Sequence, residues 1–296
     1  MQYRPLGPSG LSVSEISFGC MSLGEDHAQN ARLLHEAYDL GINLFDTADL
    51  YQRGFNEESV GRAFAGRRDQ VLIATKVGNQ WRPDGTGWDW NPRKAYILRA
   101  VEDSLRRLRT DYIDLYQLHG GTLDDPIDET IEAFEQLKAA GKIRHYGISS
   151  IRPNVVQTWL RRAGLVSVMS QYSLLDRRPE EQIMPMLAEA GIGLLVRGGV
   201  AKGLLAGKPA AGYLEHEAPA VARVQGALAT LGGDPAAWAL RYALDAPAVA
   251  TVVAGIRTGA QLRANVAASQ LPPLTPVQRQ QLDDVIPPLV YTQHRV

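Results

Sequence analysis

The sequence predicts a (β/α)8 barrel, on three observations. Short apolar runs rich in β-branched residues alternate with longer segments whose apolar residues recur at helical spacing. Eight such strand–helix pairs follow one another within 296 residues, about the length expected of this fold. The rival, a doubly wound open sheet, needs a glycine-rich phosphate loop at its first strand-to-helix turn. Residues 19–24 occupy that turn and lack the G-x-G-x-x-G pattern, so the barrel is favoured.

The first half of the chain begins with a predicted hairpin and continues with four strand–helix pairs. Residues 3–6 and 11–13 flank Gly7-Pro8-Ser9-Gly10, a turn sequence typical of a hairpin. The predicted strands are residues 15–19, 44–46, 71–75 and 111–118. The helices expected after them are residues 30–40, 56–64, 92–107 and 126–140.

The second half repeats the alternation and ends in an appended helix. Its predicted strands are residues 142–149, 166–171, 193–197 and 249–253. Its predicted helices are residues 154–162, 180–190, 221–231, 235–244, 259–268 and the appended 276–285. No Pro/Gly/Ser-rich linker divides the chain, so we expect residues 1–296 to form a single domain.

The composition excludes several classes of function. Hydrophobic residues make up 45% of the chain and charged residues 21%, as in globular proteins rather than disordered ones. The net charge of −1 gives no electrostatic basis for binding nucleic acid or an anionic membrane. Cys20 is the only cysteine, which excludes an intramolecular disulfide. With no signal-peptide pattern and no apolar run near the roughly 20 residues of a membrane span, we expect a cytoplasmic protein.

Polar side chains gather at the ends of three neighbouring predicted strands. In this barrel the chemistry lies at the carboxyl ends of the strands and in the loops after them. Asp46 ends the second strand with Tyr51 in its loop, Lys76 follows the third, and His119 ends the fourth. Taken singly, Asp46 is explained as the cap of a turn, Lys76 as an amine that extends to solvent, and His119 as a buried core histidine. Tyr51 alone indicates little. Together they predict a catalytic site.

The chemistry that fits these four residues is proton donation by a phenol. Free tyrosine has a pKa near 10, and lowering it by about 3 requires about 4 kcal/mol. A lysine ammonium about 4 Å away supplies roughly that much at an effective dielectric constant of about 20. We therefore expect Lys76 to lower the pKa of Tyr51, Asp46 to hold Lys76, and His119 to position a substrate oxygen. A Schiff-base aldolase using Lys76 is the rival, but it leaves Tyr51 and His119 without roles.

Four motifs resemble the aldo-keto reductase family along nearly the whole chain. They are GINLFDTADLY at 41–51, IATKV at 73–77, DYIDLYQLH at 111–119 and GKIRHYGIS at 141–149. The resemblance implies an NAD(P)H-dependent carbonyl reductase with the tetrad Asp46, Tyr51, Lys76 and His119. Some members of the family are instead redox sensors or regulatory subunits with little turnover, but no tetrad residue is lost here.

The same resemblance implies where the cofactor binds. Ser149, Ser150 and Gln171 would bond the nicotinamide carboxamide, while Arg197 stands where an aromatic residue usually stacks on the ring. A guanidinium can also stack on a ring. The loop after the seventh strand would approach the pyrophosphate through glycines, with a lysine as countercharge. The loop residues concerned are Gly198, Val200, Lys202 and Gly203.

The adenosine half of the cofactor is expected at the start of the last barrel helix. A helix N-terminus favours phosphate, Arg257 could pair with a 2′-phosphate, and Asn265 resembles the family's adenine contact. Gln261 stands where the family often has arginine, and Gly255 ends the strand before. We expect NADPH, with NADH possible, and no bound metal.

Three tryptophans in residues 80–90 suggest an apolar or aromatic carbonyl substrate. Trp81 and Trp88 are the candidate substrate contacts, the alternative being that they pack the loop onto the barrel. Gly120 and Gly121 are expected to leave the pocket open beside His119. The substrate itself and the oligomeric state are not indicated.

Overall fold

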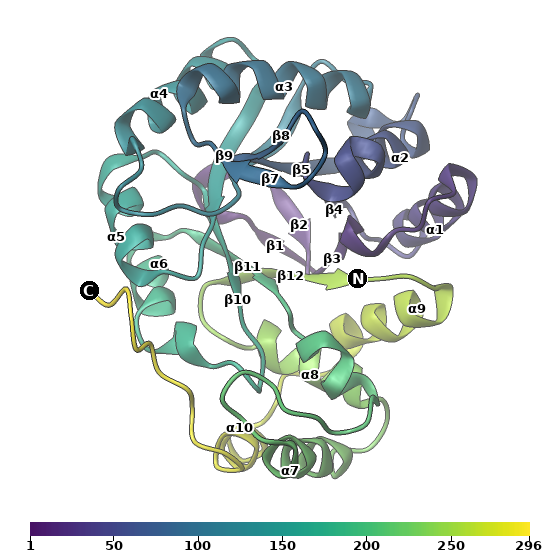
Figure 1. The fold of residues 1–296 in the computed structure, drawn as a ribbon. Coiled ribbons are helices and arrows are strands. Elements are labelled where there is room, and N and C mark those ends of the chain that lie inside the picture. The colour runs from purple at the N-terminus through teal and green to yellow at the C-terminus, as the bar shows by residue number, and fades with distance from the viewer.

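The computed structural model describes residues 1–296 and confirms the closed parallel barrel. In Figure 1 the strands occupy the centre of the molecule and the helices surround them. The barrel closes because β10 is hydrogen-bonded to β11 on one side and to β9 on the other. Its strands are β3 (Ile16–Gly19), β4 (Leu44–Asp46), β5 (Leu72–Val77), β8 (Ile113–Leu118), β9 (Ile143–Ser149), β10 (Ser167–Gln171), β11 (Gly193–Arg197) and β12 (Val249–Gly255).

Each barrel strand is followed by helix, which covers its outer face. The barrel helices are α1 (His27–Asp39), α2 (Phe55–Ala63), α3 (Lys94–Leu108), α4 (Ile127–Ala139), α5 (Pro153–Arg162), α6 (Ile183–Ala190), α7 (Ala218–Ala229), α8 (Pro235–Leu244) and α9 (Gly259–Ala267). The appended helix α10 (Pro276–Asp283) lies beside α7, outside the barrel ring (Figure 1). None of the helices combines the length and apolar character needed to cross a membrane.

Helix starts are where the structure departs most from the sequence-based boundaries. Helix α1 begins at His27 rather than at residue 30, because the Asp26 carboxylate caps it by accepting from the amides of Ala28 and Gln29. Helix α3 begins at Lys94, two residues after the proline expected to start it. Helix α6 begins at Ile183, after a short 3-10 turn.

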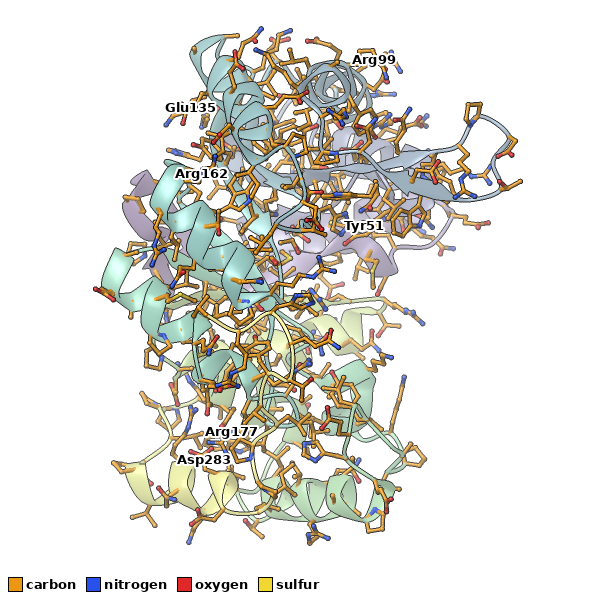
Figure 2. All side chains as sticks on the ribbon, turned by 60° about the vertical axis from the view of Figure 1, so that its left-hand side comes forward. Tyr51, Arg99, Glu135, Arg162, Arg177 and Asp283 are labelled. Carbon is orange, nitrogen blue, oxygen red and sulfur yellow. The ribbon has the colours of Figure 1, made fainter.

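Two hairpins stand outside the barrel, and only one was predicted. The expected hairpin pairs β1 (Tyr3–Pro5) with β2 (Ser12–Ser14), and its turn packs at Gly7 against the backbone that precedes β10 and β11. The other pairs β6 (Asn79–Trp81) with β7 (Trp88–Trp90), in the segment expected to be a loop after β5. Figure 2 shows this β6–β7 hairpin extending outward from the body of the molecule near Tyr51.

The apolar core has two layers, as parallel strands buried on both faces require. A cluster of 66 buried residues fills the space between strands and helices, and a cluster of 10 lies inside the barrel. Above the inner cluster the barrel interior becomes polar, with Asp46, Lys76 and Gln117 all buried. The core therefore ends where the candidate site begins.

Candidate active site

A buried lysine–aspartate pair forms the floor of the site. Strand β4 is paired with β5, which brings Asp46 and Lys76 side by side at the carboxyl end of the barrel. The Lys76 ammonium donates to Asp46 Oδ2 at 2.6 Å, to the carbonyl oxygen of Thr47 at 2.8 Å and to the Tyr51 hydroxyl at 3.5 Å. Gln117 Nε2 donates to the other Asp46 oxygen at 3.2 Å. The three hydrogens of the ammonium thus have three acceptors.

The charge of Lys76 is maintained by its neighbours. Burial alone lowers the pKa of this amine, but Asp46 and Tyr51 raise it above its ordinary value. Lys76 is therefore a cation at neutral pH. A Schiff-base mechanism needs a neutral amine with a free lone pair, so the environment of Lys76 argues against the aldolase alternative.

Tyr51 lies at the start of a tight turn that aims its hydroxyl at Lys76. The two residues after it, Gln52 and Arg53, have φ angles of 49° and 55°, and Gly54 has 89°. Non-glycine residues in this left-handed region cost free energy that the surrounding structure must supply. Sequence reasoning gave no indication of this turn.

Asn56 fixes the turn from behind and was also missed. Its fully buried amide donates to the Cys20 carbonyl at 2.7 Å and accepts from the Thr47 hydroxyl at 2.7 Å. Its Nδ2 also lies 3.3 Å from Gln52 Oε1. Asn56 thereby joins the loop after β3, the loop after β4 and the turn that carries Tyr51.

The expectation of a lowered Tyr51 pKa is wrong. Burial raises the pKa of this phenol, and the nearby Lys76 and Arg197 cations offset the effect only in part. The Lys76 contribution has the expected sign, but the cost of placing a phenolate away from water is larger. The phenol is consequently protonated at neutral pH, with a cation positioned to stabilise the phenolate formed when the proton leaves.

His119 faces Tyr51 as a neutral imidazole. The two rings meet edge to face with their centroids 5.9 Å apart. Burial, together with the Lys76 and Arg197 cations, lowers the pKa of His119 to about 3. Its Nδ1 is buried and has no hydrogen-bond partner within the protein. A buried polar atom of this kind normally has a partner, so this nitrogen is an exception within the site.

The strand ends of β9, β10 and β11 bring the nicotinamide candidates to the same mouth. Ser149 ends β9 and is half-buried, and Ser150 follows it and is buried. Gln171 ends β10 and accepts from Arg197 Nη1 at 2.8 Å through its Oε1. Arg197 ends β11 and influences the pKa values of both Tyr51 and His119. The structure therefore brings this set next to the tetrad.

The loop after β11 is built from left-handed turns. Gly198, Lys202 and Gly203 have φ angles of 76°, 58° and 92°. Val200 is half-buried, whereas the Lys202 side chain is exposed. Successive backbone amides in such turns form a concave group of hydrogen-bond donors that suits anions. The geometry of this loop is therefore compatible with binding the pyrophosphate.

The loop after β12 ends at the N-terminus of α9. Thr258 caps the helix by accepting from the amide of Gln261 at 3.2 Å, and Gln261 Oε1 accepts from the amide of Arg257 at 2.9 Å. The Gln261 side chain thus closes the turn, while the Arg257 side chain is exposed. Gly255 is exposed at the end of the strand and Asn265 is buried within the helix.

Tryptophans anchor the β6–β7 hairpin beside the site. Trp81 Nε1 donates to the carbonyl of Leu50 at 3.2 Å, and Trp90 Nε1 donates to Asp125 at 2.8 Å. The Trp90 ring lies against Gly120, where a side chain would meet it at 3.3 Å. The expectation of an open pocket beside Gly120 is therefore wrong, because Trp90 covers this side. Trp88 is 47% exposed.

The fold and the site define a barrel enzyme with a buried lysine–carboxylate pair beside a phenol and a neutral imidazole. The chain belongs to the aldo/keto reductase family, whose sequence model matches residues 15–287. It is thus an oxidoreductase of the carbonyl reductase class, and its family uses a nicotinamide cofactor.

Its relatives include solved structures and curated proteins. The aldo-keto reductase AKR11C1 of Bacillus halodurans is 52% identical in its holo form, with a TM-score of 0.96 and full coverage of both chains. Its apo form gives a TM-score of 0.88. The uncharacterized oxidoreductase YqkF of Bacillus subtilis is 48% identical over the full length of both chains. The NADH-specific methylglyoxal reductase of Escherichia coli is 30% identical over 90% of this chain and 93% of its own.

Proposed function

We propose that this protein reduces an aldehyde or ketone to an alcohol with NADPH, and that Tyr51 is the proton donor. The observation that carries the proposal is the position of the Lys76 ammonium, between Asp46 at 2.6 Å and the Tyr51 hydroxyl at 3.5 Å. This arrangement supports a phenol that is protonated at rest and has a cation ready for its conjugate base.

The residues divide the work of one reduction step. When bound, the reduced nicotinamide supplies the hydride for the carbonyl carbon. The neutral His119 ring donates a hydrogen bond to the carbonyl oxygen and orients it. Tyr51 transfers its proton to that oxygen as the C=O double bond becomes a single bond. The phenolate left behind is stabilised by Lys76, which Asp46 and the Thr47 carbonyl hold in place.

The candidate cofactor residues fit a nicotinamide dinucleotide. Ser149, Ser150 and Gln171 would hold the carboxamide, and Arg197 would lie against the ring. The loop containing Gly198, Val200, Lys202 and Gly203 would hold the pyrophosphate, and α9 would take the adenosine end. One observation supports the fit: a closer likeness to the holo form of AKR11C1 than to its apo form.

The preference for NADPH over NADH rests on two exposed cations, Arg257 and Lys202. Neither side chain is engaged in an ion pair, so both charges are available to the phosphates of the cofactor. The 30% identical relative from Escherichia coli is named as NADH-specific, so the family resemblance does not decide the matter. Equal kcat/KM with the two cofactors would contradict the NADPH assignment.

The non-reacting part of the substrate is assigned to the surface between the Tyr51 turn and the β6–β7 hairpin. A cleft of about 590 Å³ lies there, lined by Glu25, Gln52, Arg53, Phe55 and Trp81. Trp81 Nε1 donates to the carbonyl of Leu50, and the Arg53 guanidinium lies over its ring, 4.9 Å from the centroid. Trp88 lies at the exposed rim of the same hairpin. From the Phe55 and Trp81 rings in this lining we infer a carbonyl compound with an apolar or aromatic substituent.

The test is NADPH oxidation against a panel of aldehydes and ketones, with Tyr51→Phe as the matched variant. We expect kcat to fall by at least about 100-fold in Tyr51→Phe, with NADPH binding retained. Reductase activity that persists in this variant would refute the proposed donor. Tight NADPH binding without turnover of any carbonyl would favour a cofactor-binding sensor instead.

A further inference from the structure

Asp176 is a fully buried carboxylate beside Gln171, one of the residues proposed to hold the nicotinamide. The proposed reaction gives Asp176 no role. It lies five residues after the end of β10. Its Oδ2 accepts from Gln171 Nε2 at 2.8 Å and from Arg178 Nη2 at 2.8 Å, and its Oδ1 accepts from Arg178 Nε at 2.7 Å. Burying a carboxylate is costly unless it is well paired, so its contact with Gln171 calls for a role.

The chemistry of these partners forces one orientation on the Gln171 amide. A carboxylate only accepts hydrogen bonds and a guanidinium only donates them. Gln171 Nε2 must therefore face Asp176, and Oε1 must face Arg197, whose Nη1 lies 2.8 Å away. Tyr213 takes the second hydrogen, because its hydroxyl lies 3.3 Å from Nε2. The only remaining capacity of this amide is the second lone pair of Oε1.

Two tight turns hold Asp176 and Tyr213 against Gln171. Ser173 and Asp176 exchange backbone hydrogen bonds of 3.2 and 2.9 Å, and Tyr213 and His216 exchange bonds of 2.9 and 3.0 Å. The neighbouring Arg177 donates to the Asp283 carbonyl at the end of α10, and the two residues lie together in Figure 2. The acceptors around Gln171 are therefore fixed before any ligand binds.

We propose that Asp176, assisted by Tyr213, is a positioning residue that makes Gln171 an acceptor only, and so sets the rotation of the nicotinamide carboxamide. The amide N–H of the carboxamide then points to Gln171 Oε1, and its oxygen points away, toward the serines at the end of β9. Ser150 Oγ already accepts from the amide of Arg152 at 3.2 Å and keeps its own hydrogen free to donate. This inference rests on the proposed function.

The decisive comparison uses NADPH and its 3-acetylpyridine analogue, in which a methyl group replaces the carboxamide NH2. The wild-type protein should bind NADPH about three- to tenfold more tightly than the analogue, the range for one hydrogen bond. In Asp176→Asn a donor NH2 meets either Gln171 or Arg178, so that Arg197 alone still holds the orientation of Gln171. NADPH affinity should then fall toward that of the analogue, while analogue affinity changes less than twofold.

Dissociation constants from tryptophan fluorescence titrations provide the readout, with 2′,5′-ADP as a ligand that lacks nicotinamide. Unchanged 2′,5′-ADP binding shows that the variant is folded. If Asp176→Asn cannot be obtained folded, Tyr213→Phe replaces it, and we expect a smaller loss of preference, about two- to threefold.

Three results would overturn the inference. The first is a wild-type protein that binds NADPH no more tightly than the analogue. The second is an equal loss of affinity for both ligands in the variant, and the third is no loss of affinity for either. A wild-type protein that binds neither dinucleotide would refute the proposed function itself, which keeps the two failures distinguishable.

Discussion

Lys76 Nζ and Asp46 Oδ2 lie 2.6 Å apart in a pair whose side chains are only 1% and 5% exposed. Taking two charges out of water costs about as much as their attraction returns, so a buried pair is weak evidence for stability. The pair is better explained by its third neighbour, the Tyr51 hydroxyl 3.5 Å from Nζ. It serves the chemistry proposed for the phenol.

Replacing Lys76 by methionine should show separately what the ion pair contributes to catalysis and what it contributes to stability. The variant should lose at least about 100-fold in kcat, because the Tyr51 phenolate no longer has a cation beside it. It should also lose about 3–5 kcal/mol of unfolding free energy, since Asp46 stays buried without its partner. Urea unfolding and steady-state kinetics on the same preparation measure both effects.

The double variant Asp46→Leu/Lys76→Met is the control. Removing both charges should restore most of the stability while leaving the enzyme inactive. Recovery of activity together with stability would show that the pair matters only for folding.

His119 should give the protein a measurable pH dependence of stability. Its pKa is about 3 in the folded state, against an ordinary value of 6.5. Below pH 6.5 the unfolded chain binds a proton that the folded protein does not, so stability is lost as pH falls from 6.5 toward 3. The slope attributable to this residue is about 1.4 kcal/mol per pH unit.

Comparison with His119→Asn isolates this slope from those of the other histidines. Unfolding free energies measured between pH 6.5 and 4.5 should decline less steeply in the variant. Identical slopes would mean that His119 takes up a proton in the folded protein as well, so that the imidazole at the site would become charged as pH falls below about 6.5.

The sequence was sufficient to place the tetrad because strand ends in a barrel follow from the alternation of strands and helices. Asp46 and Lys76 end adjacent strands, so their proximity depends only on the strand order. The pKa of Tyr51 was predicted in the wrong direction because it depends on burial as well as on distance from Lys76. Burial of one side chain among several loops is not visible in strand spacing.

The β6–β7 hairpin and the Asn56 contacts show what local patterns leave out. Each hairpin strand is three residues long, too short to display a two-residue alternation. Asn56 makes its contacts with Cys20 and Thr47, from loops distant in sequence. At the start of a helix such an asparagine is expected to face solvent, so only the assembled structure identifies it.

Asn56→Ala should lower both stability and activity. The Thr47 hydroxyl and the Cys20 carbonyl lose a buried partner, which costs about 1–3 kcal/mol. Because the Thr47 carbonyl also accepts from Lys76, we expect kcat to fall roughly tenfold as the site loosens.

Asn43→Ala is the matched control, because Asn43 directly precedes β4 at the end away from the site. Asn43 accepts from the amide of Ser14 at 2.8 Å and donates to the Ser12 carbonyl at 2.8 Å. Its loss should destabilise the protein similarly while leaving kcat within twofold. Equal effects of the two substitutions on kcat would show that activity follows overall stability rather than the Tyr51 turn.

Arg257→Gln tests the assignment of the 2′-phosphate. The Arg257 side chain is exposed and has no ion-pair partner in the protein, so its charge is available to a ligand. A charge-assisted hydrogen bond contributes about 1.5–3 kcal/mol, and exposure to solvent reduces this to roughly one tenfold step in affinity. We therefore expect kcat/KM for NADPH to fall about tenfold and kcat/KM for NADH to change less than twofold.

Arg263→Gln makes the same charge change on α9, but Arg263 is already paired with Glu36, so it should leave the NADPH preference nearly unchanged. Equal losses in the two variants would attribute the preference to the general charge of this surface instead of to Arg257.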